Sequence, residues 1–221
     1  MPIKLLFITG NINKVNEARA ILGNKFDIEN IDIDLPEIQS TDVKEVTKYK
    51  VEAAYNEAVK KYGKDVNIIC EDTGLHFANM NDFPGALIKF YFKANGTTGI
   101  SKHNGGSKAR AVTIVGLINK KGTFLFEGET KGSVIKPKKL DEKVTSFGWD
   151  PIFIPKYPKE FEQYKGKSYA EIPKEVKNSI SQRYKAFKKL EKHFGKIKEI
   201  PSGGKKKSSI KKKSSIKKNK K

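Results

Sequence analysis

The chain has 221 residues, a hydrophobic content of 37% and a formal net charge of +20, which suits one sizeable globular domain or two small ones. Ten Lys and no acid lie between Pro201 and Lys221, so about half of the net charge sits there and the body is only moderately basic. The single Cys excludes an internal disulfide and a zinc site with CxxC spacing, and no apolar run approaches the roughly 20 residues that cross a bilayer.

The N-terminal segment predicts a strand, a glycine turn and a helix. Residues 3–8 (IKLLFI) are almost continuously apolar, as in a strand in the middle of a sheet. Thr9, Gly10 and Asn11 follow, and a helical pattern comes next. This turn places backbone N–H groups at a helix N-terminus, where phosphate binds well. Lys14 lies in the first helical turn, where its charge opposes the helix dipole; it is either a phosphate-binding residue or an ordinary surface lysine.

The next segment predicts a strand, a loop and a long helix. Residues 26–33 alternate between apolar and polar, as in a half-buried strand. The loop LPEIQ carries Glu37, which either reaches a site or is simply solvated. A helical pattern then runs from about Asp42 to Tyr62. Lys50 falls on or beside its apolar stripe, so it either extends outward to solvent or points into a cleft.

The segment NIICEDTGL predicts a strand end at which charged side chains are exposed. A short apolar strand at 66–70 is followed by Glu71 and Asp72, and then by Thr73 and Gly74. Burying either carboxylate without a partner would be costly. We therefore expect the strand to end at the two acids and to turn tightly after them.

The middle of the chain predicts a helix and a β-hairpin. The helix starts near Pro84, since proline is favoured in a first helical turn, and it carries Lys89 between aromatic residues. Two strands, at 109–118 and 123–128, are separated by a short polar turn that contains a glycine.

The segment FGWDPIF holds the only Trp of the chain, next to an acid. Trp149 is either a core residue in a turn or, with Asp150, an aromatic platform that carries a hydrogen-bonding carboxylate. We favour the platform, which suits a nucleobase, because Asp150 needs a partner. Residues 173–194 then form one amphipathic helix with apolar residues at spacings of three and four.

Strands that alternate with helices, with a hairpin between them, predict an α/β fold with a mixed sheet. We expect one domain over residues 1–196 and a low-complexity, Lys-rich, disordered tail over 197–221. The tail suggests two further hypotheses, which are sequence-independent contact with nucleic acid and a nuclear address. Without a signal peptide or a membrane segment, we otherwise expect a cytoplasmic protein.

Taken together, the motifs resemble the inosine triphosphate pyrophosphatase (ITPase) family. Their order and spacing carry the resemblance, which extends from about Ile3 to Gly195. The matching segments are TGNxxK at Thr9–Lys14, LPEIQ at Leu35–Gln39, EDTGL at Glu71–Leu75, PGxxIK at Pro84–Lys89, FGWDPIF at Phe147–Phe153 and YAEIPKEVKNSISQR at Tyr169–Arg183.

The resemblance implies a two-lobed α/β fold around a long curved mixed sheet, with the substrate in a cleft between the lobes, and a homodimer. It implies hydrolysis of ITP, dITP or XTP to the monophosphate and pyrophosphate with Mg2+, or with Mn2+ in its place. The implied phosphate-binding residues are Thr9, Asn11 and Lys14, with point charges from Lys50 and Lys89. Gly10, Thr73 and Gly74 are further implied substrate-binding residues. The implied metal ligands are Glu37 and Asp72 with Glu71 adjacent, and the implied catalytic residues are Asp72, Lys14 and Glu71.

The base-binding end implied by the resemblance is aromatic on its faces and polar at its edge. Phe147 and Trp149 would stack on the purine beside Gly148, Asp150 would accept its N1–H, and the 6-oxo edge would face Lys177, Gln182 and Arg183. Family members usually read Ser-His-Arg where this chain reads Ser181-Gln182-Arg183. Gln can still donate a hydrogen bond to a 6-oxo group. Two alternatives therefore stay open, a shifted base selectivity toward another modified nucleotide and a nucleic-acid-binding protein on an inactive scaffold.

Overall fold

The computed structural model describes residues 1–141, 143 and 148–198. At its centre is a seven-stranded sheet with the order β2-β1-β3-β5-β6-β7, and β4 pairs with β3 outside this path. The strands are β1 (Ile3–Ile8), β2 (Phe26–Ile31), β3 (Ile68–Phe77), β4 (Pro84–Gly85), β5 (Lys108–Asn119), β6 (Gly122–Val134) and β7 (Phe153–Pro155). Strand β1 is parallel to β2 and β3, whereas the other pairs are antiparallel. The expected α/β fold with a mixed sheet is therefore confirmed.

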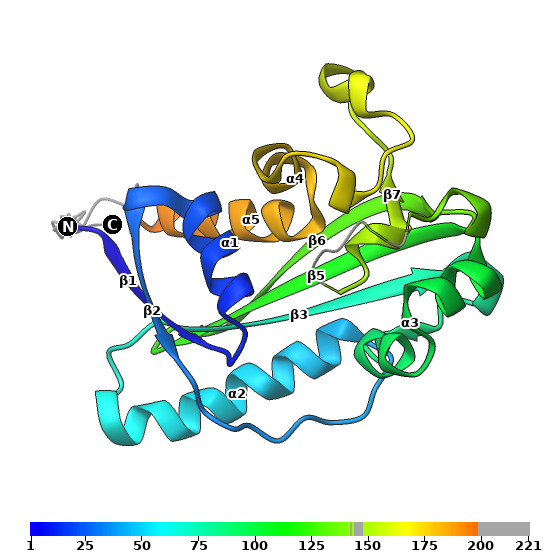
Figure 1. The fold of residues 1–221 in the computed structure, drawn as a ribbon. Coiled ribbons are helices and arrows are strands. Elements are labelled where there is room, and N and C mark those ends of the chain that lie inside the picture. Colours follow the sequence, from blue (N-terminus) through cyan, green and yellow to red (C-terminus); the bar gives the residue numbers. More distant parts are fainter. Residues whose placement is uncertain (142, 144–147, 199–221) are drawn as a thin grey trace, which may run out of the picture.

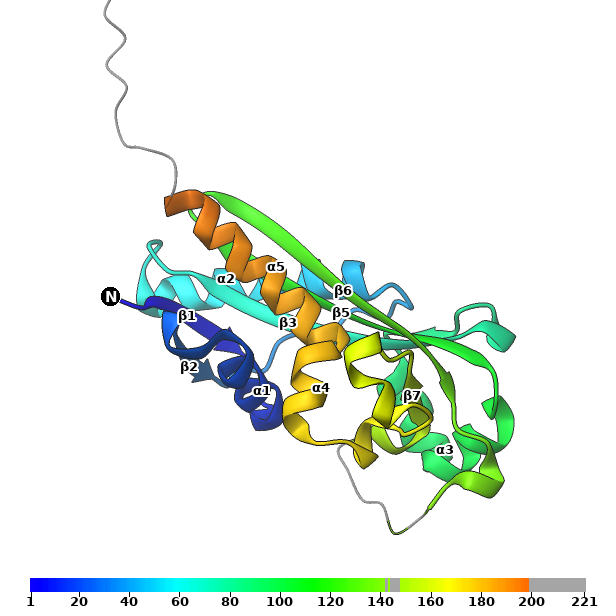
Figure 2. The same cartoon turned by 90° about the horizontal axis from the view of Figure 1, so that it is seen from above.

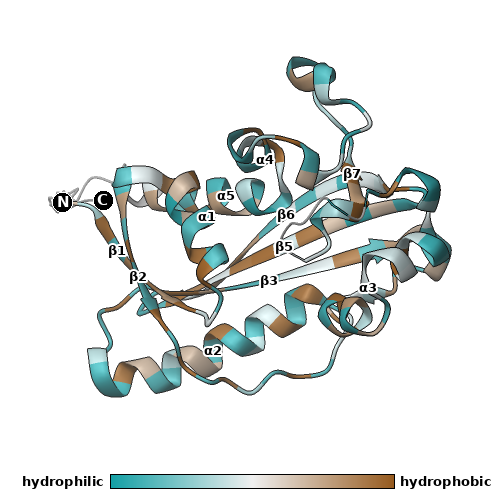
Figure 3. Ribbon diagram, viewed as in Figure 1, coloured by the Kyte–Doolittle hydropathy of each residue, from teal (hydrophilic) through white to brown (hydrophobic). Residues whose placement is uncertain are grey.

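Helices cover both faces of the sheet. They are α1 (Ile12–Leu22), α2 (Val43–Tyr62), α3 (Ile88–Asn104), α4 (Lys174–Ile180) and α5 (Gln182–Lys198). Helix α2 lies on one face, while α1 and α5 lie on the other (Figure 1), and α5 runs along β5 and β6 (Figure 2). Hydrophobic and hydrophilic residues alternate along α2, as expected for a helix with one buried side (Figure 3). No helix within the described ranges is long and apolar enough to cross a membrane.

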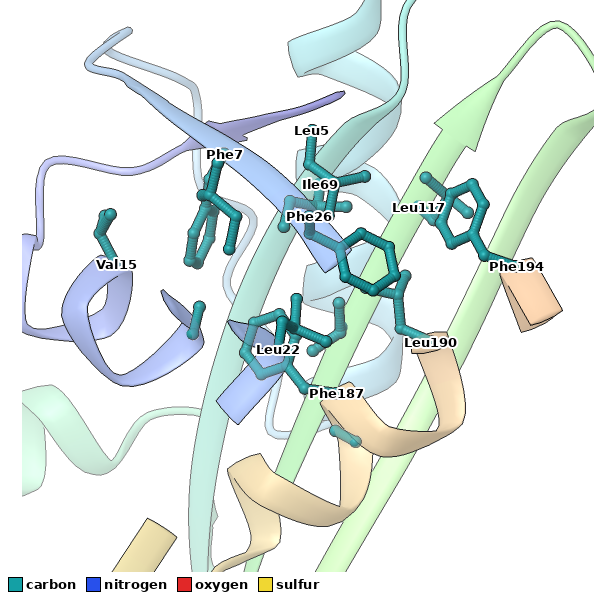
Figure 4. Packing of buried hydrophobic residues seen from close by; sticks show 14 residues of the cluster. Leu5, Phe7, Val15, Leu22, Phe26, Ile69, Leu117, Phe187, Leu190 and Phe194 are labelled. Carbon is teal, nitrogen blue, oxygen red and sulfur yellow. The ribbon is translucent and has the colours of Figure 1, made fainter. Parts of the chain in front are cut away.

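The hydrophobic core has separate parts in two lobes. In the first lobe, one cluster lies between the sheet and the α1–α5 layer, where Phe7 meets Phe187 and Phe26 meets Phe194 edge to face (Figure 4). A second cluster fills the opposite face, under α2. The other lobe has its own cluster around Phe77 and residues of α3 and β7. The long strands β3, β5 and β6 run through both lobes and connect them.

A cleft opens between the lobes because β1 is short. Strand β1 pairs with β3 only through Leu6 and Phe7, opposite Ile68 and Ile69. Beyond Ile69, β3 continues without β1 beside it, while its other edge stays paired with β5 along its whole length. The carboxyl ends of β1 and β2 therefore face an uncovered stretch of β3. This edge is where ligands generally bind in sheets with parallel strands.

The prediction that a strand ends at Glu71 and Asp72 is wrong. Strand β3 runs through both acids and on to Phe77, paired with β5. The acids do not end the strand because neighbouring cations compensate them, as described below. Gly74 does not turn the chain either. A Cβ there would lie 2.5 Å from the Val43 side chain and 2.9 Å from the backbone of Gly85, so glycine allows α2 and β4 to approach the strand.

Two predicted helices differ in their bounds. Pro84 lies in the short strand β4 opposite His76, and α3 begins only at Ile88. The predicted single helix over 173–194 is two helices, because Ser181 has extended backbone angles between α4 and α5. By contrast, the long helix capped by Asp42 and the β5–β6 hairpin are confirmed. Helix α5 extends to Lys198, past the domain boundary predicted at 196.

Candidate active site

The cleft between the lobes has a volume of about 1110 Å³ and brings together most of the predicted site residues. Phe147 lies outside the described residues, and Gly74 does not line the cleft. All the other candidates line it, namely Thr9, Gly10, Asn11, Lys14, Glu37, Lys50, Glu71, Asp72, Thr73, Lys89, Gly148, Trp149, Asp150, Lys177, Gln182 and Arg183. One cleft thus collects groups from seven segments of the sequence.

The turn before α1 is held by its own side chains. Asn11 caps the helix by accepting from the backbone N–H groups of Asn13 and Lys14, at 3.1 and 3.4 Å. The hydroxyl of Thr9 accepts from the N–H of Asn11 at 3.1 Å. Three backbone donors that could meet an anion are therefore occupied. Any anion at this end of the cleft would be held mainly by side chains, which include the amide NH2 of Asn11 and the ammonium of Lys14.

Two carboxylates meet around one lysine at the mouth of the cleft. Lys50 Nζ lies 2.7 Å from Glu37 Oε1 and 3.5 Å from Asp72 Oδ2. The side chain of Lys50 is 13% exposed, so it points into the cleft, against its default orientation toward solvent. The hydrogen bond from Lys50 lowers the pKa of Glu37, and although burial alone would lower the pKa of Lys50, the two acids raise it. At neutral pH, Lys50 is therefore positively charged and Glu37 negatively charged.

The donor set at this place suits Mg2+. The oxygens of Glu37 and Asp72 already converge on a cation, the Lys50 ammonium. Asp72 keeps Oδ2 for that contact because Oδ1 accepts from the N–H of Thr73 at 3.0 Å. Mg2+ takes one or two carboxylates and completes its shell with water and phosphate oxygens. The described residues contain no group of three or more His, Cys, Asp and Glu side chains that could hold a metal ion.

Glu71 has a different environment from its neighbour. Its carboxylate is fully buried and accepts from Arg183 Nε at 2.8 Å, from Arg183 Nη2 at 3.2 Å and from Thr73 Oγ1 at 2.6 Å. Lys14 Nζ lies 3.6 Å from Oε1 and donates to the Glu71 carbonyl at 3.1 Å. Burial alone would raise the pKa of Glu71, but Arg183 and Lys14 hold it down, at about 2. Adjacent strand residues point to opposite faces, so Glu71 turns toward α1 and α5 and Asp72 toward α2.

At the far end of the cleft, Asp150 does have a charged partner. Its Oδ2 lies 2.6 Å from Lys177 Nζ, and Lys177 also contacts Glu17 at 3.1 Å. Burial raises the pKa of Asp150, and Lys177 opposes that effect. Trp149 packs edge to face on Phe153, with ring centroids 5.7 Å apart. This leaves Trp149 half-buried on the cleft wall beside a polar group, as the platform interpretation requires.

The break between α4 and α5 places two polar side chains at the start of α5. Ser181 Oγ accepts from the N–H of Tyr184 and caps the new helix. Gln182 and Arg183 follow, and both are buried where they line the cleft. The first turn of α5 lies against β6 at Gly128, where a Cβ would come within 1.9 Å of the Gln182 carbonyl oxygen. Close approach of helix and sheet therefore fixes the backbone of Gln182.

Several residues of the site were not predicted from the sequence. Glu17, on α1, forms ion pairs with both Lys177 and Arg183 and so links these two cations. Its position one turn after Lys14 was the only signal for it. Asp32 and Asp34 follow β2 and line the cleft. Tyr169, which does not line the cleft itself, donates a hydrogen bond to Gln182.

Comparison with known proteins gives a consistent result. The model of the Ham1 family matches residues 5–193. A protein of Emericella nidulans named inosine triphosphate pyrophosphatase is 40% identical over 190 residues, which cover 84% of this chain and 93% of that protein. The protein of the same name from Saccharomyces cerevisiae is 34% identical, with 86% and 95% covered.

Among solved structures, the Staphylococcus aureus Ham1 protein superposes with a TM-score of 0.62 at 23% identity, over 88% of this chain and 99% of that one. A Ham1 protein from Coxiella burnetii gives a TM-score of 0.61 at 21% identity. These structures share the fold, and the sequence relatives share most of the length. The chain described here therefore belongs to the Ham1 family.

Proposed function

We propose that this protein hydrolyses non-standard purine nucleoside triphosphates, namely ITP, dITP and XTP, to the monophosphate and pyrophosphate with Mg2+. The observation that carries this proposal is the arrangement of the cleft, with acids and lysines at one end and an aromatic wall with buried polar groups at the other. The relatives named inosine triphosphate pyrophosphatase support the same substrate class.

At the phosphate end, side chains supply positive charge. Lys14, Lys89 and Asn11 line the cleft, and the two lysines would neutralise the triphosphate. Glu37 and Asp72 would hold Mg2+ in place of the Lys50 ammonium. The ion would supply charge stabilisation to the phosphate oxygens. Mn2+ takes similar oxygen ligands and would bind in the same place.

Attack of water at the α-phosphorus builds negative charge on the leaving pyrophosphate, so positioning and electrostatic stabilisation dominate such a reaction. We assign Asp72 the role of orienting the water and accepting its proton, because its Oδ2 faces the cleft and Oδ1 is anchored by Thr73. Glu71 is fully buried and bound by Arg183. We therefore assign it a positioning role for Arg183 and Lys14, and neither metal binding nor proton transfer.

At the base end, the purine would stack on Trp149, next to Gly148. Asp150 would accept the N1–H, and Gln182 and Arg183 would face the 6-oxo edge together with Lys177. A site with buried donors rejects a base that lacks the matching acceptor, since those donors are then left unpaired. Adenine carries a 6-amino group and no N1–H, so it would be rejected at both positions.

A substrate panel tests the proposal. With Mg2+, the purified protein should release pyrophosphate from ITP and XTP much faster than from ATP. GTP, whose base carries both N1–H and the 6-oxo group, shows whether the site also excludes a 2-amino group. Equal rates for ITP, XTP and ATP, or no hydrolysis of any, would refute the proposal. Asp72→Asn should abolish turnover while the thermal unfolding midpoint stays close to that of the wild type. The matched control is Asp65→Asn, which removes an exposed acid paired with Lys120 outside the cleft and should keep full activity.

We further propose a homodimer, on the family resemblance alone, and a cytoplasmic location, with the nucleus as the alternative that the Lys-rich tail suggests. Light scattering during gel filtration measures the mass, and a monomer at micromolar concentration would contradict the dimer. Fluorescence microscopy of the tagged protein distinguishes the cytoplasm from the nucleus. The ten Lys between Pro201 and Lys221 support the additional proposal of weak, salt-dependent contact with nucleic acid.

A further inference from the structure

A buried hydrogen bond joins Tyr169 to the residue at which this chain departs from the usual pattern of its family. Tyr169 lies in a short 3-10 turn, Tyr169–Glu171, and is 2% exposed. Its hydroxyl donates to Gln182 Oε1 over 3.2 Å. Gln182 is 3% exposed and lines the cleft. A glutamine amide has an acceptor end and a donor end, so a partner for the oxygen decides which end remains for a ligand.

We propose that Tyr169 is a positioning residue for base selectivity, because it holds the Gln182 oxygen and turns the amide NH2 toward the cleft. This inference rests on the proposed function and specifies its selectivity. An NH2 group that faces the purine edge donates to a 6-oxo group and meets a 6-amino group donor to donor. The reversed amide would present its oxygen and would accept from a 6-amino group. The orientation of one amide thus distinguishes hypoxanthine and xanthine from adenine.

The donor end of Gln182 is the end that remains available. Among the described residues, none accepts a hydrogen bond from the Gln182 amide nitrogen, and that nitrogen is not among the buried polar atoms that lack a partner. An unpaired amide nitrogen that is not buried must be open to solvent. Since Gln182 lines the cleft, the cleft is where a ligand would meet the NH2 group.

Both ends of the Tyr169–Gln182 contact are held in place. The Tyr169 ring packs on Phe153 with centroids 5.2 Å apart, and a capping box between Ser168 and Glu171 holds its backbone. The Gln182 backbone is fixed where α5 lies against Gly128. Burial raises the pKa of Tyr169, so its hydroxyl keeps its proton and remains a donor across the working pH range.

The other polar neighbour of this contact is already engaged. Thr130 Oγ1 donates to the Ile180 carbonyl at 3.1 Å and accepts from Lys185 Nζ at 3.0 Å. It therefore has no proton to give to Tyr169. The hydroxyl of Tyr169 donates to Gln182 Oε1. A reversed amide would have to donate to the Tyr169 oxygen, and the Tyr169 proton would then lose Gln182 Oε1 as its acceptor.

The test compares Tyr169→Phe with the wild type on ITP and ATP. Phe keeps the ring and removes the bond that orients the amide, so both orientations become accessible. The ratio of kcat/KM for ITP to that for ATP should fall about tenfold, because one hydrogen bond of selectivity is lost. The change should appear as a higher KM for ITP and a lower KM for ATP, with kcat for ITP largely kept, since the catalytic groups are not touched.

The matched control is Tyr157→Phe. Tyr157 belongs to the same hydrophobic cluster, and its hydroxyl donates to the Lys167 carbonyl at 2.8 Å, outside the cleft. Its removal costs a similar hydrogen bond and should leave the ITP-to-ATP ratio unchanged. If Tyr157→Phe lowers the ratio as much as Tyr169→Phe does, general loosening of the lobe explains the effect and the proposal fails.

A second variant, Gln182→Glu, keeps an acceptor for Tyr169 and removes the NH2 donor. It should lower kcat/KM for ITP at least tenfold, and it provides the test if Tyr169→Phe does not fold. Retained ITP preference in either variant would overturn the inference. If the wild type prefers ITP and Tyr169→Phe has the same ITP-to-ATP ratio of kcat/KM, only the role of Tyr169 is refuted. If the wild type does not hydrolyse ITP, the proposed function itself is refuted.

Discussion

The Glu71→Gln substitution tests how strongly the buried acid of β3 is bound. Burial would raise the pKa of Glu71, and Arg183 and Lys14 instead lower it from 4.5 to about 2. Each step of one in pKa corresponds to about 1.4 kcal/mol, so the folded state favours the charged form by about 3 kcal/mol. Removing one partner of a buried ion pair costs about 3–5 kcal/mol, because the remaining charge is left uncompensated. Both arguments predict a loss of about 3 kcal/mol at neutral pH.

The pH dependence of the stability loss in Glu71→Gln tests this prediction most directly. Because the folded pKa is depressed, the contribution of Glu71 is complete above about pH 4.5 and is lost as the pH falls toward 2. The difference between wild type and Glu71→Gln should therefore shrink in acid, since protonated Glu71 is as neutral as Gln. Urea unfolding at neutral pH and at steps down to about pH 3 measures it. A difference that stays constant with pH would refute the reasoning.

The control for this experiment is Glu29→Gln. Glu29, on the edge strand β2, forms an ion pair with Lys4 at 2.8 Å, and the two side chains are 39% and 62% exposed. Exposed ion pairs contribute about 0–1 kcal/mol. Glu29→Gln should therefore change stability little at any pH, and a loss comparable with that of Glu71→Gln would indicate that burial does not set the magnitude.

Three further outcomes follow from the geometry. Gly128→Ala on β6 should cost about 1–3 kcal/mol or more and lower turnover, because its Cβ would meet the Gln182 carbonyl at 1.9 Å. Gly195→Ala on α5, with open space around it, should be neutral or stabilising in thermal unfolding. Equal effects of the two substitutions would show that α5 tolerates the contact. Lys50→Met should increase the stabilisation by Mg2+ in a thermal-shift titration, since the ammonium no longer competes for Glu37 and Asp72. A Mg2+-induced shift smaller than that of the wild type would mean that lysine and metal bind without competing. Deletion of Pro201–Lys221 should leave ITP turnover unchanged and weaken retention on heparin, and lost turnover would place the tail in the site.

Local sequence rules predicted the elements whose signals are local. The helix after Asp42 has a cap, an apolar stripe and a glycine stop, and the hairpin has alternating strands around a glycine turn, so both were predictable. The break at Ser181 was missed because the apolar spacing of three and four continues across it, through Ile180 and Tyr184. A change of helix axis does not alter that spacing, so no count of apolar positions could detect it.

The site was predictable as a set of residues and less so as a set of contacts. The choice between Glu71 and Asp72 could not be made from the sequence, because it depends on which face of β3 carries Arg183 and which carries Lys50. The same holds for Glu17, which meets Lys177 and Arg183 across more than 150 residues of chain. Long-range ion pairs produce no periodic pattern in a sequence. The motifs that contain their residues can still be recognised by their order and spacing.

The buried and half-buried charges of the cleft form a continuous series of alternating sign. It runs from Asp150 through Lys177, Glu17 and Arg183 to Glu71, and then to Lys14 at the other end of the cleft. Groups in one network respond jointly, so substitutions within it should not add. A double-mutant cycle between the two ends would then report a coupling energy, and a change in how a base is bound would be felt electrostatically at the phosphates. Selection of the base and hydrolysis of the triphosphate would thus be thermodynamically coupled through the protein as well as through the substrate.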